Sequence, residues 1–219
     1  MKIGIIGAGA IGGTLARNLA KLGHDVRVSN SRDPQTLSEL SAEAGIEAVW
    51  AKDAAEDADL VIVSIPQKNT PDLAPGIVSA RKPGAPVIET NNYYPQQRDG
   101  KIAAIEDGTA ESVWVSEQID APVYKVFNGI YWKHLREKGV PAGTEGRIAL
   151  PIAGDDEDGK KIVSAIVDDL GFEPVDAGTL AESWRQQPGS PSYGKDFGAQ
   201  RLTEALAEAT PERTAEWRA

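Results

Sequence analysis

Apolar residues occur along the chain in short, nearly continuous runs rather than in strict alternation with polar ones. Continuous runs rich in β-branched residues are typical of strands that are covered on both faces of a parallel sheet. The predicted strands are residues 3–6, 26–29, 60–65, 86–90, 123–127, 148–153 and 172–175.

Between these runs the apolar residues recur at helical spacing. Ile11, Leu15, Leu19 and Leu22 share one face of a helix that Gly23 is placed to end. Further helices are predicted over residues 156–170, 36–45, 71–80, 131–137 and 199–209. Because strands and helices alternate, the sequence predicts an α/β fold built from βαβ units.

The first predicted strand runs directly into a glycine-rich turn that fits G-x-G-x-x-G and opens a helix. Gly7 permits the tight turn, Gly9 leaves room for a pyrophosphate, and Gly12 allows close packing of helix and strand. The helix N-terminus adds free N–H groups for the phosphates. The sequence therefore predicts a Rossmann-like, doubly wound, mostly parallel sheet whose dinucleotide site contains Gly7, Ala8, Gly9, Ala10, Ile11 and Gly12.

The second predicted strand is followed by Asn30, Ser31 and Arg32, where an NAD site normally carries Asp or Glu. An acid at this place repels a 2′-phosphate, whereas Asn, Ser and Arg donate hydrogen bonds and Arg adds a charged clamp. The missing acid therefore favours NADP(H) over NAD(H). The alternative, in which Arg32 is a solvated loop residue, stays open.

The later strand ends reach the same crevice, because ligands of open α/β sheets bind at the carboxyl ends of the strands. Ser64, Ile65 and Pro66 follow one apolar run and Asn91 follows the next. All four are candidates for cofactor contact, although Ser64 is equally a strand terminator and Asn91 equally a turn residue.

Composition narrows the class of protein. The chain has 219 residues and a formal net charge of −10, which argues against nucleic acid and anionic membranes as partners. We predict an NADP-binding Rossmann domain over residues 1–154 and a small α/β extension over 155–219 that completes a substrate pocket. No signal peptide or membrane-length apolar stretch is recognisable, so a cytoplasmic location is expected.

The chain has no Cys and two His, which removes thiolate chemistry and makes a transition-metal site unexpected. His24 and His134 are interpreted as structural or surface residues. Trp114, Tyr124 and Trp132 are predicted in the core, and Trp184 is the best aromatic candidate for substrate contact. The closing residues 211–219 are expected to be frayed, although Trp217 is unusual for a free tail.

Several segments together resemble the NADP-dependent reductases of the deazaflavin coenzyme F420. They are the glycine turn and residues 29–32, 92–95, 125–128 and 181–184. The resemblance covers nearly the whole chain, from Met1 to the loop around Tyr193.

The resemblance implies direct hydride transfer between NADP(H) and F420, with no acid–base residue required, and a homodimer. It also implies that Asn128, Ser183 and Trp184 border the second pocket. F420 is an anion, and Lys125, Lys133, Arg136 and Arg185 are available to bind it.

Two other functions remain open at this point. One is an NADPH-dependent reductase of a small imine, ketone or other acceptor. The other is a module without enzymatic activity that senses NADP(H). Turnover of NADPH with any acceptor distinguishes an enzyme from a sensor.

Overall fold

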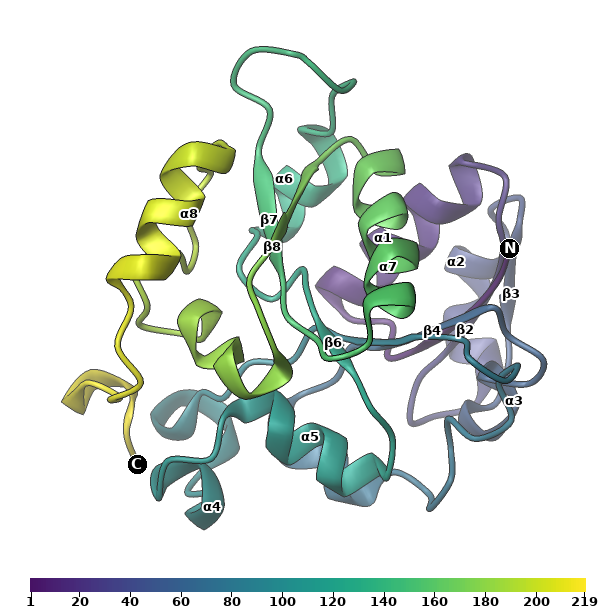
Figure 1. The fold of residues 1–219 in the computed structure, drawn as a ribbon. Helices are drawn as coiled ribbons and strands as arrows, with labels where there is room; N and C mark the ends of the chain where they lie inside the picture. Colours follow the sequence, from purple (N-terminus) through teal and green to yellow (C-terminus); the bar gives the residue numbers. More distant parts are fainter.

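The computed structural model describes residues 1–219 and contains a six-stranded parallel sheet with helices on both faces (Figure 1). The strands are β1 (Lys2–Ile6), β2 (Asp25–Ser29), β3 (Ile46–Ala48), β4 (Leu60–Val63), β5 (Val87–Glu89), β6 (Tyr124–Lys125), β7 (Ala149–Ile152) and β8 (Glu173–Asp176). The α-helices are α1 (Ala10–Lys21), α2 (Ser38–Ser41), α3 (Ala51–Ala54), α4 (Ala103–Glu106), α5 (Glu111–Ile119), α6 (Trp132–Glu137), α7 (Glu157–Asp169) and α8 (Ala199–Glu208).

The strand order of the large sheet is β3-β2-β1-β4-β5-β6. This is the order of a Rossmann dinucleotide-binding sheet, in which the direction of winding reverses between β1 and β4. The switch point lies where the glycine turn leaves β1. The fold is therefore Rossmann-like α/β, as the sequence predicts.

Alternate residues of each central strand face opposite sides of the sheet. In β4, Leu60 and Ile62 join the apolar cluster under α1 and α7, whereas Val61 and Val63 join the cluster under α5. All four are fully buried. Figure 1 shows α1 and α7 on one side of the sheet and α5 on the other. Burial on both faces explains why the strands are continuous apolar runs.

The C-terminal part forms a small βαβ unit in which β7 and β8 pair in parallel and α7 crosses between them. This sheet touches the large one through a single antiparallel bridge between Lys125 and Ala153. The β7–β8 unit spans the domain boundary predicted at residue 154, because β7 lies before it and β8 after it. Residues of β7 and α7 share one apolar cluster with β1 and α1, so the unit extends the Rossmann core.

The two amphipathic helices predicted over 11–22 and 156–170 are confirmed as α1 and α7. Gly23 and Gly171 follow them with φ of +86° and +91°. Two other helix predictions are wrong in part. Residues 36–45 contain only the short α2 after a turn of 3₁₀ helix, and residues 71–80 contain no α-helix.

The closing residues 211–219 are tied to the fold by the side chains of Arg213 and Trp217 instead of being frayed. Arg213 is almost fully buried in an ion pair with Glu111, and the Trp217 ring lies 6.0 Å from the Tyr94 ring. The expectation of a free tail is therefore wrong, and the unusual Trp217 has a packing partner. No helix is long and apolar enough to span a membrane.

Candidate dinucleotide and substrate site

The three glycines of the motif, in the turn between β1 and α1, have three different structural roles. Gly7 has a φ of +111°, which L-residues rarely adopt, and its N–H donates to the Ser29 carbonyl at 2.9 Å. A Cβ on Gly12 would lie 1.9 Å from the Gly7 carbonyl oxygen, so helix and turn are in direct contact there. A Cβ on Gly9 would meet nothing within 4 Å.

The open position at Gly9 matches the place that a pyrophosphate requires. Gly9 is the N-cap of α1 and no side chain caps the helix. The first N–H within the helix to find a partner is that of Gly13, which donates to the Gly9 carbonyl at 2.8 Å. The preceding N–H groups are therefore free to bind an anion. Ala8, Gly9 and Ala10 also line a cavity of about 670 Å³.

At the end of β2 the predicted residues divide into a turn residue and two exposed donors. The Asn30 side chain accepts from the Arg32 N–H at 2.8 Å and donates to the Thr36 hydroxyl at 2.9 Å. Asn30 therefore shapes the turn. Ser31 and Arg32 are exposed, and the Arg32 guanidinium forms no hydrogen bond or ion pair within the chain.

The end of β4 lies directly against the glycine turn. A Cβ on Gly7 would lie 2.1 Å from the Ser64 carbonyl oxygen, and a Cβ on Gly12 would lie 3.2 Å from the Ser64 Cβ. The Ser64 hydroxyl is held by the Thr90 hydroxyl at 2.9 Å. The Ile65 side chain belongs to the same contact, since its Cγ2 would lie 2.9 Å from a Cβ on Gly7. Pro66 then precedes a turn of 3₁₀ helix over Gln67–Asp72.

Asn91 supports this edge from within the fold. Its side chain is buried, accepts from the Ile65 N–H at 3.1 Å and donates to the Thr70 hydroxyl at 3.4 Å. The side chain is thus used to position Ile65. Both ends of the Asn91 side chain therefore already have partners within the protein.

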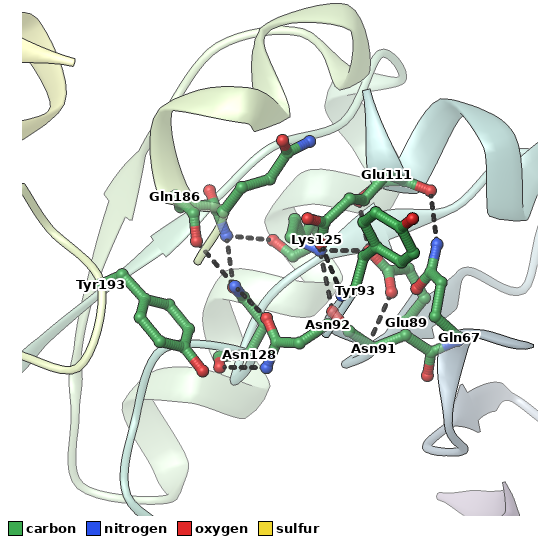
Figure 2. A network of polar contacts seen from close by, with 12 residues as sticks. Gln67, Glu89, Asn91, Asn92, Tyr93, Glu111, Lys125, Asn128, Gln186 and Tyr193 are labelled. Atoms are coloured by element: carbon green, nitrogen blue, oxygen red, sulfur yellow. Dashed lines mark hydrogen bonds and ion pairs between the residues drawn. The ribbon is translucent and has the colours of Figure 1, made fainter. Parts of the chain in front are cut away.

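The next strand end brings Asn128 beside Asn92, as Figure 2 shows. Asn92 donates to the Asn128 carbonyl at 2.8 Å, and Asn128 donates to the Asn92 side-chain oxygen at 3.1 Å. Gln186 fixes the pair, since it donates to the Asn128 side-chain oxygen at 3.1 Å and accepts from the Asn128 amide at 2.7 Å through its carbonyl. Asn128 follows Phe127, whose φ of +63° is uncommon for an aromatic residue and marks a sharp turn after β6.

The two other residues expected at the second pocket lie on a short 3₁₀ helix, Leu180–Gln186. Ser183 is fully buried and its hydroxyl has no hydrogen-bond partner. Trp184 stacks with Arg185 and lines two small cavities, of about 300 and 200 Å³, with residues 105–110 and 208–214. Neither cavity is lined by a predicted cofactor residue, because the short helix that carries both residues packs against α5.

The cationic residues considered as ligands of an anionic substrate lie in different parts of the structure. Lys125 is fully buried and donates to Glu89 at 3.0 Å, so it is unavailable to a ligand. Arg185 stacks on Trp184, away from the glycine turn. Arg136 and Trp132 line the large cavity beside that turn, so Trp132 is a cavity residue and not the core residue that was expected.

Beneath the site lies a buried network of charges that the sequence analysis did not identify (Figure 2). Lys125 on β6 contacts Glu89 on β5 and, at 4.0 Å, Glu111 on α5. Lys125 also donates to the Asn91 carbonyl at 3.0 Å. Glu89 accepts from the Asn91 N–H at 2.8 Å and from the Ser112 hydroxyl. The sequence did contain a signal for this network. Two apolar strands that pair in the sheet each carry one charged residue, and Glu89 and Lys125 have opposite signs.

Neither histidine lies at this edge. Burial and the neighbouring N-terminal ammonium, which lies 3.3 Å from Nδ1, lower the pKa of His24. His134 pairs with Asp196 at 2.9 Å between α6 and the loop before α8. No cluster of three or more metal-ligating side chains is present. The site therefore offers a dinucleotide cradle and fixed amides, without a histidine at the carboxyl ends of the strands.

Comparison with known proteins agrees with this class of site. Residues 2–93 match the family model described as NADP oxidoreductase, coenzyme F420-dependent. The crystal structure of hypothetical protein SMa0349 from Sinorhizobium meliloti is 31% identical with a TM-score of 0.75, and the alignment covers 90% of this chain and 95% of that one. The chain belongs to the coenzyme F420-dependent NADP oxidoreductase family.

Two further relatives mark the range of similarity. A proposed F420-dependent NADP reductase from Arthrobacter sp. FB24 is 22% identical with a TM-score of 0.66, over 84% of this chain and 87% of that one. Escherichia coli (strain K12) YjhV is 44% identical over 67 residues, or 31% of this chain. The matched region spans about half the length of YjhV.

Proposed function

We propose that the protein transfers a hydride between NADP(H) and the deazaflavin coenzyme F420. The observation that carries the proposal is a continuous row of contacts along one edge of the sheet. It runs from Gly12 to Ser64, from Ile65 to Asn91, and from Asn92 to Asn128. A dinucleotide whose pyrophosphate lies at Gly9 would extend its nicotinamide along this row.

The residues present fit NADP(H). The free N–H groups before Gly13 would hold the pyrophosphate, and the unpaired Arg32 with Ser31 would hold the 2′-phosphate. Ser64 and Ile65 would border the nicotinamide ribose at the end of β4. Family membership supports F420 as the second substrate.

NADPH supplies a hydride from nicotinamide C4, which with one proton from solvent reduces the deazaflavin by two electrons and leaves NADP⁺. The protein's share of this reaction is alignment of two flat rings at close range. Asn92 and Asn128 are locked to one another and to Gln186, so they present a rigid polar wall to the second ring. Tyr94 and Tyr193 extend this wall through a hydroxyl–hydroxyl hydrogen bond.

The experiment that tests the proposal mixes protein with oxidised F420 and follows the loss of deazaflavin absorbance after NADPH or NADH is added. We expect rapid loss with NADPH and slow loss with NADH. No loss, with NADPH binding still detectable by titration, would reject F420 and direct the search to imines, ketones and quinones. Absence of turnover with every acceptor would leave an NADP(H)-sensing module.

A double variant separates direct transfer from proton-coupled reduction. Because neither histidine lies at the carboxyl ends of the strands, alanine at both His24 and His134 should leave the rate of F420 reduction within about twofold of the parent. A loss of about a hundredfold would instead indicate a general acid, as reduction of a carbonyl or imine requires.

We also propose that the protein is a homodimer, on the basis of the family resemblance. Light scattering after size-exclusion chromatography tests this directly, since the chain mass is 23.3 kDa. A mass equal to that of one chain at working concentration would reject the dimer.

A further inference from the structure

The segment 210–219 packs against the chain that follows β5 and against α4 and α5. Arg213 donates to a Glu111 carboxylate oxygen at 2.6 Å and its guanidinium lies 5.0 Å from the centre of the Tyr93 ring. The Arg213 side chain is 9% exposed and that of Glu111 is fully buried. Gln96 donates to the Arg218 carbonyl at 3.0 Å, which ties the segment to the chain after β5.

Glu111 links Arg213 to the chain that follows β5. Its second carboxylate oxygen accepts the Tyr93 N–H at 3.1 Å and lies 4.0 Å from Lys125. Burial raises the pKa of Glu111, while Lys125 and Arg213 oppose that rise. The carboxylate is thus held between two cations, one from β6 and one from the segment 210–219, and it anchors the residue between Asn92 and Tyr94.

Trp217 gives the segment a second anchor, beside Tyr94 and Tyr193. Its ring centre lies 6.0 Å from that of Tyr94 and 6.2 Å from that of Tyr193. A Cβ on Gly189 would lie 2.6 Å from the Trp217 ring, so the loop before α8 passes directly over it. The three rings make an aromatic corner beside the Asn92–Asn128 pair.

We propose that residues 210–219 form a strap that completes the second-substrate pocket, with Arg213 as a positioning residue. Through Glu111 and Tyr93, Arg213 fixes Asn92 and Tyr94 against a flat, ring-containing hydride acceptor. The inference rests on the proposed function and adds to it a residue that lies 122 positions beyond Asn91, the last predicted cofactor residue.

The first test compares Arg213→Met with the parent in the F420 assay. We expect KM for F420 to rise at least about tenfold, while the Kd for NADPH stays within about twofold because the glycine turn is untouched. Arg201→Met is the matched control, since Arg201 is an exposed arginine paired with Glu208 on α8. That variant should change neither constant.

The pH dependence distinguishes positioning from simple packing. In Arg213→Met, Glu111 keeps only Lys125, so the pKa of Glu111 rises further and its carboxyl takes up a proton, and loses its unbalanced charge, already at a higher pH than in the parent. The deficit in KM should therefore shrink as pH falls and grow as pH rises. The double variant Glu111→Gln/Arg213→Met carries no unbalanced charge and should recover KM to within about threefold of the parent at every pH.

A KM equal to that of the parent in Arg213→Met would overturn the proposal. A deficit that does not vary with pH and that Glu111→Gln does not rescue would overturn it as well. Both outcomes are read only if the parent reduces F420, which is the separate test of the proposed function.

A second readout does not depend on the substrate. The Tyr93 amide donates to Glu111, so Arg213→Met should speed hydrogen exchange at Tyr93 by about tenfold or more and leave the amides of β1 unchanged. Unchanged exchange at Tyr93 would refute the strap even if F420 is not the substrate.

Discussion

Single residues at the glycine turn differ in what surrounds them, and the difference assigns their roles. Gly7 and Gly12 are glycines because the protein itself fills the space where a Cβ would lie. Gly9 is surrounded by open space, so the fold imposes no such need there. The requirement for glycine at this position is then best explained by a ligand.

Replacement of Gly9 by Val should abolish dinucleotide binding and leave the fold intact. The Cβ of the added side chain would meet no protein atom within 4 Å, and the side chain would occupy the pyrophosphate position. We expect the Kd for NADPH to rise about a hundredfold or more, or roughly 3 kcal/mol, with little change in the melting temperature. Fluorescence titration and thermal unfolding measure the two effects.

Gly12→Val is the contrasting variant, since its Cβ would lie 1.9 Å from the Gly7 carbonyl oxygen. This variant should lose stability as well as binding. Normal NADPH binding by Gly9→Val would show that the glycine turn does not hold the pyrophosphate.

Arg32 is the residue that should decide between the two dinucleotides. Its guanidinium has no partner within the chain and follows the strand end where an acid would select NAD. Arg32→Ala should weaken NADPH binding by about 1.5–3 kcal/mol, or roughly ten- to a hundredfold, with little effect on NADH. Equal losses for both dinucleotides, measured by the same titration, would exclude contact with the 2′-phosphate.

At the scale of elements, the sequence correctly predicts the strands and helices whose buried residues recur at a regular spacing. The central strands are apolar on both faces, and α1 and α7 each carry an apolar stripe, so all were predictable. The strand β3 was missed because it is three residues long and Glu47 at its centre is exposed. The predicted helix over 71–80 is absent, since local spacing cannot show that Pro71 lies within a 3₁₀ turn.

The candidate site divides in the same way. The glycine turn and the end of β2 follow from a local motif and were predictable. The contacts of Asn92 with Asn128, of Tyr94 with Tyr193 and of Glu111 with Arg213 form only after the sheet and the C-terminal segment have folded, and no spacing along the chain relates these partners. Ser183 and Trp184 were assigned by resemblance, and the short helix that carries them turns Ser183 into the core.

The start of α7 offers a test of how one cap supports two elements. The Asp156 side chain accepts from the Gly159 N–H at 2.7 Å, and the Tyr124 hydroxyl on β6 lies 3.3 Å from the same oxygen. Burial and this carboxylate raise the pKa of Tyr124 to about 12. Asp156→Ala should lower the free energy of unfolding by about 1 kcal/mol, as measured by urea denaturation.

The exposed Asp158 in the same turn is the matched control, because it only pairs with Lys161 at the surface. Asp158→Ala should change stability far less. Equal effects of the two variants would mean that general acidity at the helix start, and not the cap, stabilises α7.

At the scale of the whole molecule, one buried set of charges joins parts that are far apart in the chain. Glu89 comes from β5, Glu111 from α5, Lys125 from β6 and Arg213 from the C-terminal segment. Two cations balance two carboxylates in surroundings that exclude water. Such a set is strongly destabilised when one member is removed, because the remaining charge stays buried.

Lys125→Met should therefore lower the free energy of unfolding by about 3–5 kcal/mol at neutral pH. Two buried carboxylates would then share one cation, so the pKa of at least one of them would rise above its unfolded value of about 4.3. A carboxyl whose pKa is raised on folding binds more protons in the folded state. The free energy of unfolding of the variant therefore falls as pH rises from the unfolded pKa to the folded pKa of that carboxyl.

The deficit of Lys125→Met should for this reason be smaller at about pH 5 than at about pH 8, as measured by urea denaturation at both. Lys161→Met is the control, since Lys161 is exposed on α7 and should show no deficit at either pH. Adding Glu89→Gln to Lys125→Met removes the excess charge and should recover part of the loss. A deficit of equal size at both pH values would mean that Lys125 stabilises the sheet by packing of its aliphatic chain and not by its charge.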